Sequence, residues 1–569
     1  MDNDKILSII SNELEHSSFR DSDVYNVQIP LAYYLGLPNG TEIEGRSTIT
    51  STDVADAIEW IMPQIMKSFT HNNEIVVFDP VHEGDEKQAD LESEYVYDVL
   101  MKQNEGFICL HQFIKDALMQ RNGILKIYYE EEDDVKTESY SGLNEIQVQM
   151  LAAQENVDIL SMSQDVDEMG MLVFSVKVSI TEKKGKVCVE SVPIEQFRLN
   201  SDHNSISLEK ARFTAHIVRK TISELIEEGY DKDILDDLAT SDDNLNDYRF
   251  QDQNEVTNWA SGYASLDKSL RLVTLVEAYM YMDANEDGIA EYVKICAAGN
   301  ENIPTHILAI DEIDYSPWIG TTPILMSHKF QGLSVFDRLK QIQDQKTSLW
   351  RNIMDNMYLQ NNQRMLIVNG QVNIDDLLVS RPGGIIRTDS LDAVMPLQTP
   401  QIGPVAFDMM RYLDEVRGGR SGVSPEGAAT QNNIGNKVGS EGVDRLMTAK
   451  EELVGLIVRV ISETGIKPAC IKIRDLLCKH IDAIQDFKFR GQWVKVNPAQ
   501  WSSRSRCTVR VGTGTGDNRA KLGAIRELLG LQQQIISMPG QALLKPENVY
   551  KTLDDFYKFS AILRPSFAA

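Results

Sequence analysis

The longest helical pattern in the chain covers residues 333 to 361, which contain neither proline nor glycine. Its apolar residues recur at steps of three, four or seven, which places them on one stripe of a straight helix: Phe336, Leu339, Ile342, Leu349, Ile353 and Met357. Ser334, followed three residues later by Asp337, is typical of a capped helix start. At 1.5 Å per residue this helix would be roughly 40 Å long. We therefore predict a rod that packs along one apolar stripe and exposes its other faces to water.

A compact segment, residues 362 to 403, follows this helix. Its pattern predicts strands at 365–368 and 385–387 and a helical turn at 375–378. About 40 residues are too few to build an independent hydrophobic core. We therefore expect neighbouring surfaces, such as those of further copies of the chain, to support this segment.

A second helix is expected to lead back from this segment, because Pro404 suits the first position of a helix. The helix would end at Gly418 and Gly419. The apolar residues of its expected packing face are Val405, Met409, Leu413 and Val416. Two helices would thus flank a small α/β insert.

Residues 422 to 440 are rich in Gly, Asn and Gln, and their only charged residues are Glu426 and Lys437. Such a segment cannot bury enough apolar surface to order itself, so we predict a flexible, uncharged loop. A long helix at 441–481 is expected to follow, and Pro468 must bend or break it because proline cannot donate to the helical ladder. The apolar residues expected on one face of this helix are Leu446, Leu453, Ile457, Val460 and Ile461.

The remaining sequence mixes helical and strand patterns, which predicts an α+β protein. Further helices are predicted after Thr52 and at 91–100, 107–118, 203–230, 517–537 and 546–563. Further strands are predicted at 124–129, 171–180, 186–192, 272–281, 289–295, 307–310, 493–496 and 508–511. We expect irregular structure for most of residues 1–50, a solvated loop at 130–134, a turn at 183–185 and a mobile polar excursion at 231–256.

Composition narrows the possible functions. With 569 residues the chain should form several domains. Its net charge of −29 repels polyanions, which argues against tight wrapping of nucleic acid but not against a passage through which DNA slides. The six cysteines form no CxxC pair, which favours a reducing compartment over a disulfide framework or a zinc site. The acidic start is unlike a secretory signal, and no stretch is apolar enough to span a membrane, so we expect synthesis in the cytoplasm.

Two motifs imitate functional sites. The glycines at 512, 514 and 516 follow a predicted strand, but they match neither GxGxxG nor a P-loop. A nucleotide-dependent enzyme using this turn is therefore the weaker alternative. Asp283 to Gly288 resembles the first half of a calcium loop, yet Lys294 stands where the bidentate Glu belongs, so a hairpin turn is the better interpretation and calcium stays open. Ser421 lies outside a GxSxG elbow, no HExxH is present, and no catalytic set emerges.

The order of these predicted parts resembles the core of the tailed-bacteriophage portal family. The parts are a long helix, a small insert, a return helix, a flexible loop and a long bent helix. The segments 32–40, 44–49 and 53–61 are similar to the opening of portals from short-tailed phages, and 511–514 is similar to a glycine turn of the same group. The domains that this resemblance implies are a wing at 1–332 and 441–537, stem helices at 333–361 and 404–421, a clip at 362–403, a tunnel loop at 422–440 and a short crown at 538–569.

The resemblance implies a structural, non-enzymatic protein without cofactor or metal. Portals of this kind form twelve-subunit rings at a capsid vertex of the virion and provide the channel for packaging and ejection of double-stranded DNA. Their partners are the terminase large subunit, the head-to-tail adaptor and tail proteins, the major capsid protein and the scaffold, with no membrane partner. Another ring protein of the phage neck or tail is the nearest alternative.

The resemblance also assigns candidate site residues. Those of the tunnel loop are Gln431, Asn432, Asn433, Asn436 and Lys437. Those of the channel face of the stem are Asp408, Arg411, Glu415 and Arg417. Those of the clip, where the motor and the adaptor would dock, are Asp375, Asp376, Arg381 and Arg387.

Overall fold

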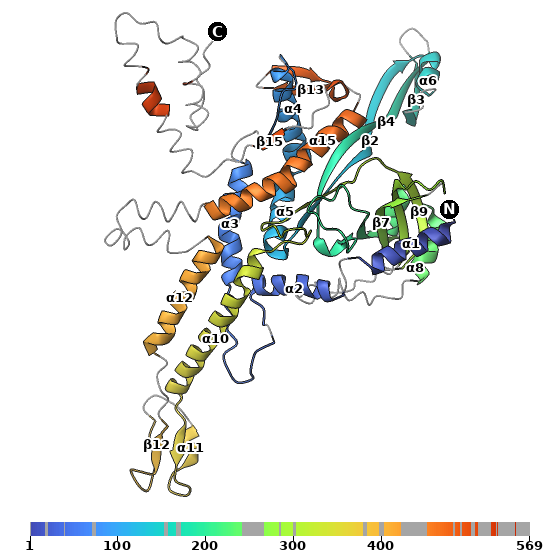
Figure 1. Ribbon diagram of the computed structural model, residues 1–569. Helices are drawn as coiled ribbons and strands as arrows, with labels where there is room; N and C mark the ends of the chain where they lie inside the picture. The colour runs from blue at the N-terminus through green and yellow to red at the C-terminus, as the bar shows by residue number, and fades with distance from the viewer. Residues whose placement is uncertain are drawn as a thin grey trace, which may run out of the picture.

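A computed structural model describes most of the chain and combines helices with antiparallel sheets, which confirms the α+β class. Figure 1 shows a body of helices and sheets from which two helices protrude, with a small tip at their far end. The described residues are 2–17, 21–38, 40–70, 75–82, 84–152, 157–166, 172–241, 267–283, 286–299, 303–378, 384–397, 403–422, 452–481, 484–489, 492–501, 507–509, 525–530, 532 and 552.

The protruding helices are α10, Val335–Asn361, and α12, Gly403–Ser421, which lie side by side (Figure 1). The predicted capped start of α10 is confirmed. The N–H of Asp337 donates to the hydroxyl of Ser334, and the Asp337 carboxylate accepts the N–H of Ser334. These reciprocal bonds satisfy backbone donors that would otherwise lack partners in the first turn.

The packing faces of the two helices match the prediction only in part. The apolar stripe of α10 is mostly buried, but Met357 near its end is 50% exposed. On α12, Val405 and Met409 are exposed, whereas Leu413 is buried. The buried positions of α12 are Ala406, Met410, Leu413, Arg417, Gly418 and Ser421. Two adjacent stripes of α12 carry apolar residues, and contact with α10 decides which one is buried.

The helix α12 also extends further than expected. It continues through Gly418 and Gly419 and ends at Ser421. Glycine weakens a helix interior but does not prevent it, so the end inferred from the two glycines was two residues too early, whereas the bound of 421 implied by the resemblance agrees with α12.

The polar face of α10 contacts protein where solvent was expected. A segment that we call the strap, residues 40–52, runs along this face. Arg351 of α10 donates hydrogen bonds to the carbonyl of Ile49, the hydroxyl of Thr41 and the carboxylate of Glu42, at 2.9, 2.8 and 2.6 Å. Polar side chains therefore bind the backbone and side chains of the strap instead of water.

The tip of the protrusion holds β11, Met365–Ile367, paired antiparallel with β12, Val394–Pro396, and the short helix α11, Ile374–Leu378 (Figure 1). The predicted first strand and helical turn are confirmed. The predicted strand at 385–387 is wrong, because β11 takes its partner from further along the chain. Short apolar runs in a small insert do not reveal which of them will pair.

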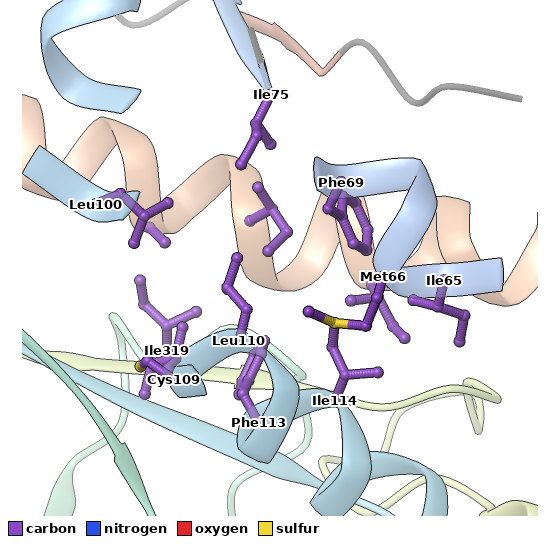
Figure 2. Packing of buried hydrophobic residues seen from close by; sticks show 14 of the residues in the cluster. Ile65, Met66, Phe69, Ile75, Leu100, Cys109, Leu110, Phe113, Ile114 and Ile319 are labelled. Carbon is purple, nitrogen blue, oxygen red and sulfur yellow. The ribbon is translucent and has the colours of Figure 1, made fainter. Parts of the chain in front are cut away.

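The body is built on helices whose bounds are α3, Asp53–Thr70; α4, Glu86–Asp98; a π-helical turn, Val99–Gln103; and α5, Gly106–Gln120. The predicted helices in this region are confirmed. Their apolar faces meet in the largest core of the chain. Figure 2 shows this packing between Ile65, Met66 and Phe69 of α3 and Leu110, Phe113 and Ile114 of α5.

The long helix after the loop is described from residue 452. A π-helical turn, Ser462–Ile466, joins its first part to α15, Lys467–His480. Pro468 lies at the start of α15 and does not break the helix. Ile457 and Ile461 are buried as predicted, whereas Leu453 is partly exposed. The predicted residue Leu446 lies outside the described residues.

The N-terminal region is more helical than the sequence suggested. Helices α1, Asn3–Glu15, and α2, Asp21–Leu35, replace the irregular structure expected for most of residues 1–50. Ile6, Ile10 and Leu14 of α1 are buried against a sheet formed by residues far along the chain. This short amphipathic helix is therefore stabilised by tertiary packing more than by its own propensity.

One sheet has four antiparallel strands in the order β10-β2-β4-β3. Their bounds are Trp318–Thr321, Gly123–Leu143, Leu172–Val192 and Val157–Val166, and α6, Glu145–Ala152, lies between β2 and β3. The solvated loop expected at 130–134 and the turn expected at 183–185 are both wrong. Both segments continue their strands and pair with each other, with Glu132 opposite Lys184 in register. A run of polar residues in a sequence is easily interpreted as a loop, because the sequence does not reveal the strand with which it pairs.

The second sheet has five antiparallel strands in chain order, β5 to β9. Their bounds are Phe197–Leu199, Phe213–Thr221, Leu272–Met282, Glu291–Gly299 and Pro304–Glu312. The three later strands confirm the prediction. The helix predicted at 203–230 is mostly wrong, because 213–221 forms β6 and only α7, Ile222–Glu227, is helical. Helix α8, Lys232–Ser241, occupies the start of the expected polar excursion.

The C-terminal part contributes two small strand pairs. β13, Gln485–Phe489, pairs with β14, Gln492–Val496, and β15, Cys507–Val509, pairs with β1, Val76–Phe78. The tunnel-loop segment, the glycine turn at 512–516, almost all of the crown and most of the helix predicted at 517–537 lie outside the described residues. Among the helices that are described, none is both long and apolar enough to cross a membrane.

Candidate functional site

Three of the four expected channel residues share one exposed face of α12. Asp408, Arg411 and Glu415 follow one another at steps of three and four and are exposed. They point away from the face that packs on α10, which carries Ala406 and Met410. This face carries two carboxylates and one guanidinium, so its formal charge is nearly balanced.

The fourth expected channel residue, Arg417, is placed elsewhere. Its side chain is buried, and its Nη1 atom donates to Oδ1 of Asp53 at 2.5 Å. The same oxygen accepts Nζ of Lys346 at 2.7 Å, and Lys346 also donates to Asp414 at 2.8 Å. Arg417 therefore joins α12 to α3 and is not part of the exposed face.

Two of the four expected clip residues, Asp376 and Arg387, form a salt bridge with each other. Arg387 donates to the two carboxylate oxygens of Asp376 at 2.7 and 3.0 Å, and its backbone N–H also donates to Asp376. These bonds tie the segment around Arg387 to α11, in bidentate geometry. Asp375 is exposed on α11, and Arg381 lies outside the described residues.

The clip segment exposes many apolar side chains among its described residues. Its large apolar residues with the highest exposure are Leu378 at 76%, Ile385 at 80% and Leu391 at 99%. Among the described clip residues only Ala393 is buried. Both strands of the β11–β12 pair also present their side chains to solvent. Exposed apolar surface of this extent on a small segment marks an interaction surface.

A cavity of about 500 Å³ lies between the strap and α10. Its lining is mainly polar and includes Tyr33, Arg46, Asp344, Arg351 and Asp355. Tyr33 donates its hydroxyl hydrogen to Asp344 at 2.7 Å, so part of the lining is engaged within the chain. Within the described residues, no group of three or more His, Cys, Asp or Glu side chains is arranged to hold a metal ion.

The motifs that imitate functional sites have structural roles where they are described. Asp283 accepts the backbone N–H groups of Asp287 and Gly288 at 3.0 and 2.8 Å, in the connection between β7 and β8. This confirms the predicted hairpin turn. Ser421 is buried and donates to the carbonyl of Arg417 at 2.9 Å. The strand before the glycine turn, β15, belongs to an antiparallel pair with β1.

Sequence reasoning missed the buried charges around Asp53, although one signal was present. Lys346 lies between Ile342 and Leu349 on the apolar stripe of α10, where a cation requires a buried partner. The identity of that partner could not be inferred, because Asp53 is almost three hundred positions away in the chain.

A comparison with curated proteins gives no match. A comparison with protein families gives a match to the family described as phage SU10 portal protein, over residues 6–565 and thus over nearly the whole chain. The matched region includes α10, α12, the segment between them and the sheets of the body. The chain therefore belongs to the phage SU10 portal protein family.

Proposed function

We propose that the chain assembles into a twelve-subunit ring at a capsid vertex of the virion, and that double-stranded DNA passes through this ring during packaging and ejection. The observation that carries the proposal is the clip. Its described residues bury only Ala393, and its Leu391 side chain is 99% exposed in the single chain. A segment without its own core requires contacts with neighbours to become stable.

The neighbours are further copies of the same chain. Burial of apolar surface is favourable by about 25 cal/mol per Å². The exposed residues Leu378, Ile385 and Leu391 would therefore gain from contacts around a ring. A contact between two different faces of identical subunits closes into a ring when the rotation per subunit fits. The ring order of twelve follows from the resemblance to tailed-phage portals.

The exposed face of α12 suits a channel through which DNA slides. Asp408, Arg411 and Glu415 place little net charge on this face. The chain as a whole carries −29, and a ring multiplies that charge. Repulsion between the ring and the phosphate backbone acts within about 10 Å at ordinary salt, so DNA is guided and not held.

The remaining parts follow from the same arrangement. The clip, at the free end of the stem, would dock the terminase large subunit during packaging and the head-to-tail adaptor afterwards, with Asp375 and Arg381 as candidate contacts. The pair Asp376 and Arg387 would keep the docking surface in shape. The wing would contact the major capsid protein and the scaffold. We assign no catalytic residue, cofactor, metal or membrane partner to the chain.

Charged substitutions in the clip test this proposal. Leu378→Asp and Leu391→Asp should leave the fold of the single chain intact, because both side chains are exposed there. They should abolish or strongly weaken ring formation, because the new carboxylates would be buried between copies. The matched control is Gln371→Glu, a new carboxylate at an exposed polar position of the same segment.

Ring formation is measured by negative-stain microscopy and by light scattering on the purified full-length chain. Rings of unchanged number and size in both leucine variants would contradict the proposal. Loss of rings in the Gln371→Glu control as well would mean that any added charge is disruptive.

A further inference from the structure

The cluster around Asp53 joins three helices through a single carboxylate. Asp53, in the first turn of α3, is 1% exposed. Its Oδ1 atom accepts Lys346 of α10 at 2.7 Å and Arg417 of α12 at 2.5 Å, and its Oδ2 atom accepts the hydroxyl of Ser51 at 2.6 Å. Asp414 of α12 completes the cluster through Lys346 at 2.8 Å.

Backbone groups reinforce the same junction. The N–H of Val54 donates to the side chain of Gln343 at 2.9 Å, and the N–H of Ser51 donates to Thr347 at 3.1 Å. Both acceptors belong to α10. The start of α3 is therefore bound by polar side chains of α10, in a contact whose geometry is more specific than that of apolar packing.

The cluster lies where it can fix the position of α12 relative to the body of the molecule. Within the described residues, α12 packs mainly on α10, through a small apolar group that includes Ile353, Ala406 and Met410. Arg417 lies one turn before the end of α12, and it reaches across to the body of the molecule. The chain beyond Ser421 leads into residues 422–440.

We propose that the Asp53 cluster is the joint that fixes the two stem helices to the body, and that Asp53 holds the C-terminal turns of α12 in place. Lys346 and Arg417 are positioned by one shared oxygen, so loss of its charge affects both stem helices at once. The joint thereby determines where the segment 422–440 begins. This inference concerns the fold of the single chain and goes beyond the proposed function.

The carboxyl of Asp53 is ionised at neutral pH. Burial by itself would raise the pKa of this carboxyl, but hydrogen bonds from Lys346 and Ser51 and the charge of Arg417 hold the pKa below its usual value. The joint is therefore formed throughout the neutral pH range.

The substitution Asp53→Asn tests the joint, because it keeps the shape and removes the charge. Amide hydrogen exchange in peptides covering 411–421 should become faster by roughly tenfold or more, since Arg417 then keeps only the more distant carboxylates of Asp414 and Asp56, both at 3.7 Å. Exchange at the clip end of α12, residues 403–409, and in the first turns of α10 should change less than about twofold.

The matched control is Asp56→Asn. Asp56 lies in the same first turn of α3, but it is 56% exposed and its nearest contact with Arg417 is 3.7 Å. This variant should leave exchange in 411–421 within about twofold of the parent, because exposed ion pairs contribute little. A similar acceleration in both variants would assign the effect to the helix start and overturn the proposal.

A second variant keeps the test decisive if Asp53→Asn is poorly folded. Arg417→Met should also accelerate exchange in 411–421. The double variant with Asp53→Asn should be less affected than the sum of the single variants predicts, because Lys346 and Asp414 remain as a balanced pair. Additive effects, unchanged exchange after Asp53→Asn, or equal acceleration over the whole chain would each overturn the joint. None of these measurements depends on ring formation.

Discussion

At the scale of single residues, buried charges connect elements that are distant in the chain. Lys126 of β2 pairs with Glu277 of β7, which links the two sheets. Burial alone would raise the pKa of Glu277, but Lys126 and His216 hold it well below its usual value. Removal of either partner of such a pair leaves an uncompensated buried charge, which destabilises a fold more than the pair itself stabilises it.

Asp116 of α5 behaves in the opposite way and gives a pH-dependent prediction. Its burial and the nearby Glu195 raise the pKa of Asp116 to about 7, against the effect of Lys115. The folded state therefore binds a proton at Asp116 more tightly than the unfolded state, so the contribution of this carboxyl to stability is greatest below pH 4 and is lost as the pH rises towards 7. Asp116→Asn should remove this loss and raise the free energy of unfolding at pH 8 by roughly 4 kcal/mol.

The measurement is denaturant unfolding of the parent and the variant at pH 4.5 and pH 8, with Asp158→Asn on the exposed surface of β3 as control. The gain at pH 8 should exceed the gain at pH 4.5. An equal gain at both pH values would show that the carboxyl of Asp116 does not titrate in this range.

At the scale of elements, the long helix accommodates Pro468 without breaking. The π-helical turn Ser462–Ile466 precedes the proline, and α15 continues directly after it. Thr464 in this turn shares a hydrogen bond of 2.7 Å with Thr321 of β10, and Gly465 packs against the ring of Phe113. Wider turns of this kind occur where a helix must absorb an irregularity.

Two glycines of this helix should respond in opposite directions to the same substitution. A Cβ at Gly465 would lie 2.9 Å from the Phe113 ring, whereas a Cβ at Gly455 meets no atom within 4 Å. Gly465→Ala should therefore lower the free energy of unfolding by about 1–3 kcal/mol through overpacking. Gly455→Ala should raise it by about 0.5–1 kcal/mol, because alanine favours a helix interior.

The measurement is the free energy of unfolding of each variant and of the parent, obtained by chemical denaturation. Stabilisation by both substitutions would mean that the core around Phe113 has room to adjust, and that the close packing of the π-helical turn is not required.

At the scale of the whole molecule, the proposed assembly accounts for the exposed apolar surface of the single chain. The stem carries exposed Phe407, Met409 and Tyr412 as well as the exposed clip residues, so the single chain leaves much of its apolar surface without a partner. The neutral segment 422–440 begins where α12 ends. In a ring, copies of this segment would surround the DNA.

Deletion of Gln431 to Asn436 separates ring assembly from the retention of DNA. The deletion removes small neutral side chains, including Asn432 and Asn433, but no part of the clip or stem, so rings should form as in the parent. Retention of packaged DNA should be impaired, because Gln, Asn and Lys437 contacts to the DNA would be lost or displaced. The measurement compares ring yield by microscopy with the amount of nuclease-protected DNA in filled heads.

Normal retention in the deletion variant would contradict a role of these residues in holding DNA and would leave the ring itself intact as a proposal. A matched replacement of the same residues by Gly and Ser tests whether side chains or loop length matter.

Much of the stem could be predicted from sequence because its signals are local. These signals are the capping box at Ser334 and Asp337, the apolar stripe of α10 and the short length of the clip segment. Each can be recognised from residues that are close together in the chain. The same holds for the hairpin turn at Asp283. Helix starts, turns and the size of a core depend on neighbouring residues, and these the sequence displays directly.

Other features were decided only by the tertiary structure. Residues 130–134 form a strand because they pair with β4. The helix α1 is stabilised because a sheet covers Ile10. Arg417 is buried because its guanidinium binds the carboxylate of Asp53. In each case the deciding partner is far away in the chain, so its position is unknown until the fold is formed. A sequence by itself determines local geometry and the amount of apolar surface, whereas the choice of which polar groups are buried depends on long-range contacts that compensate their lost hydration.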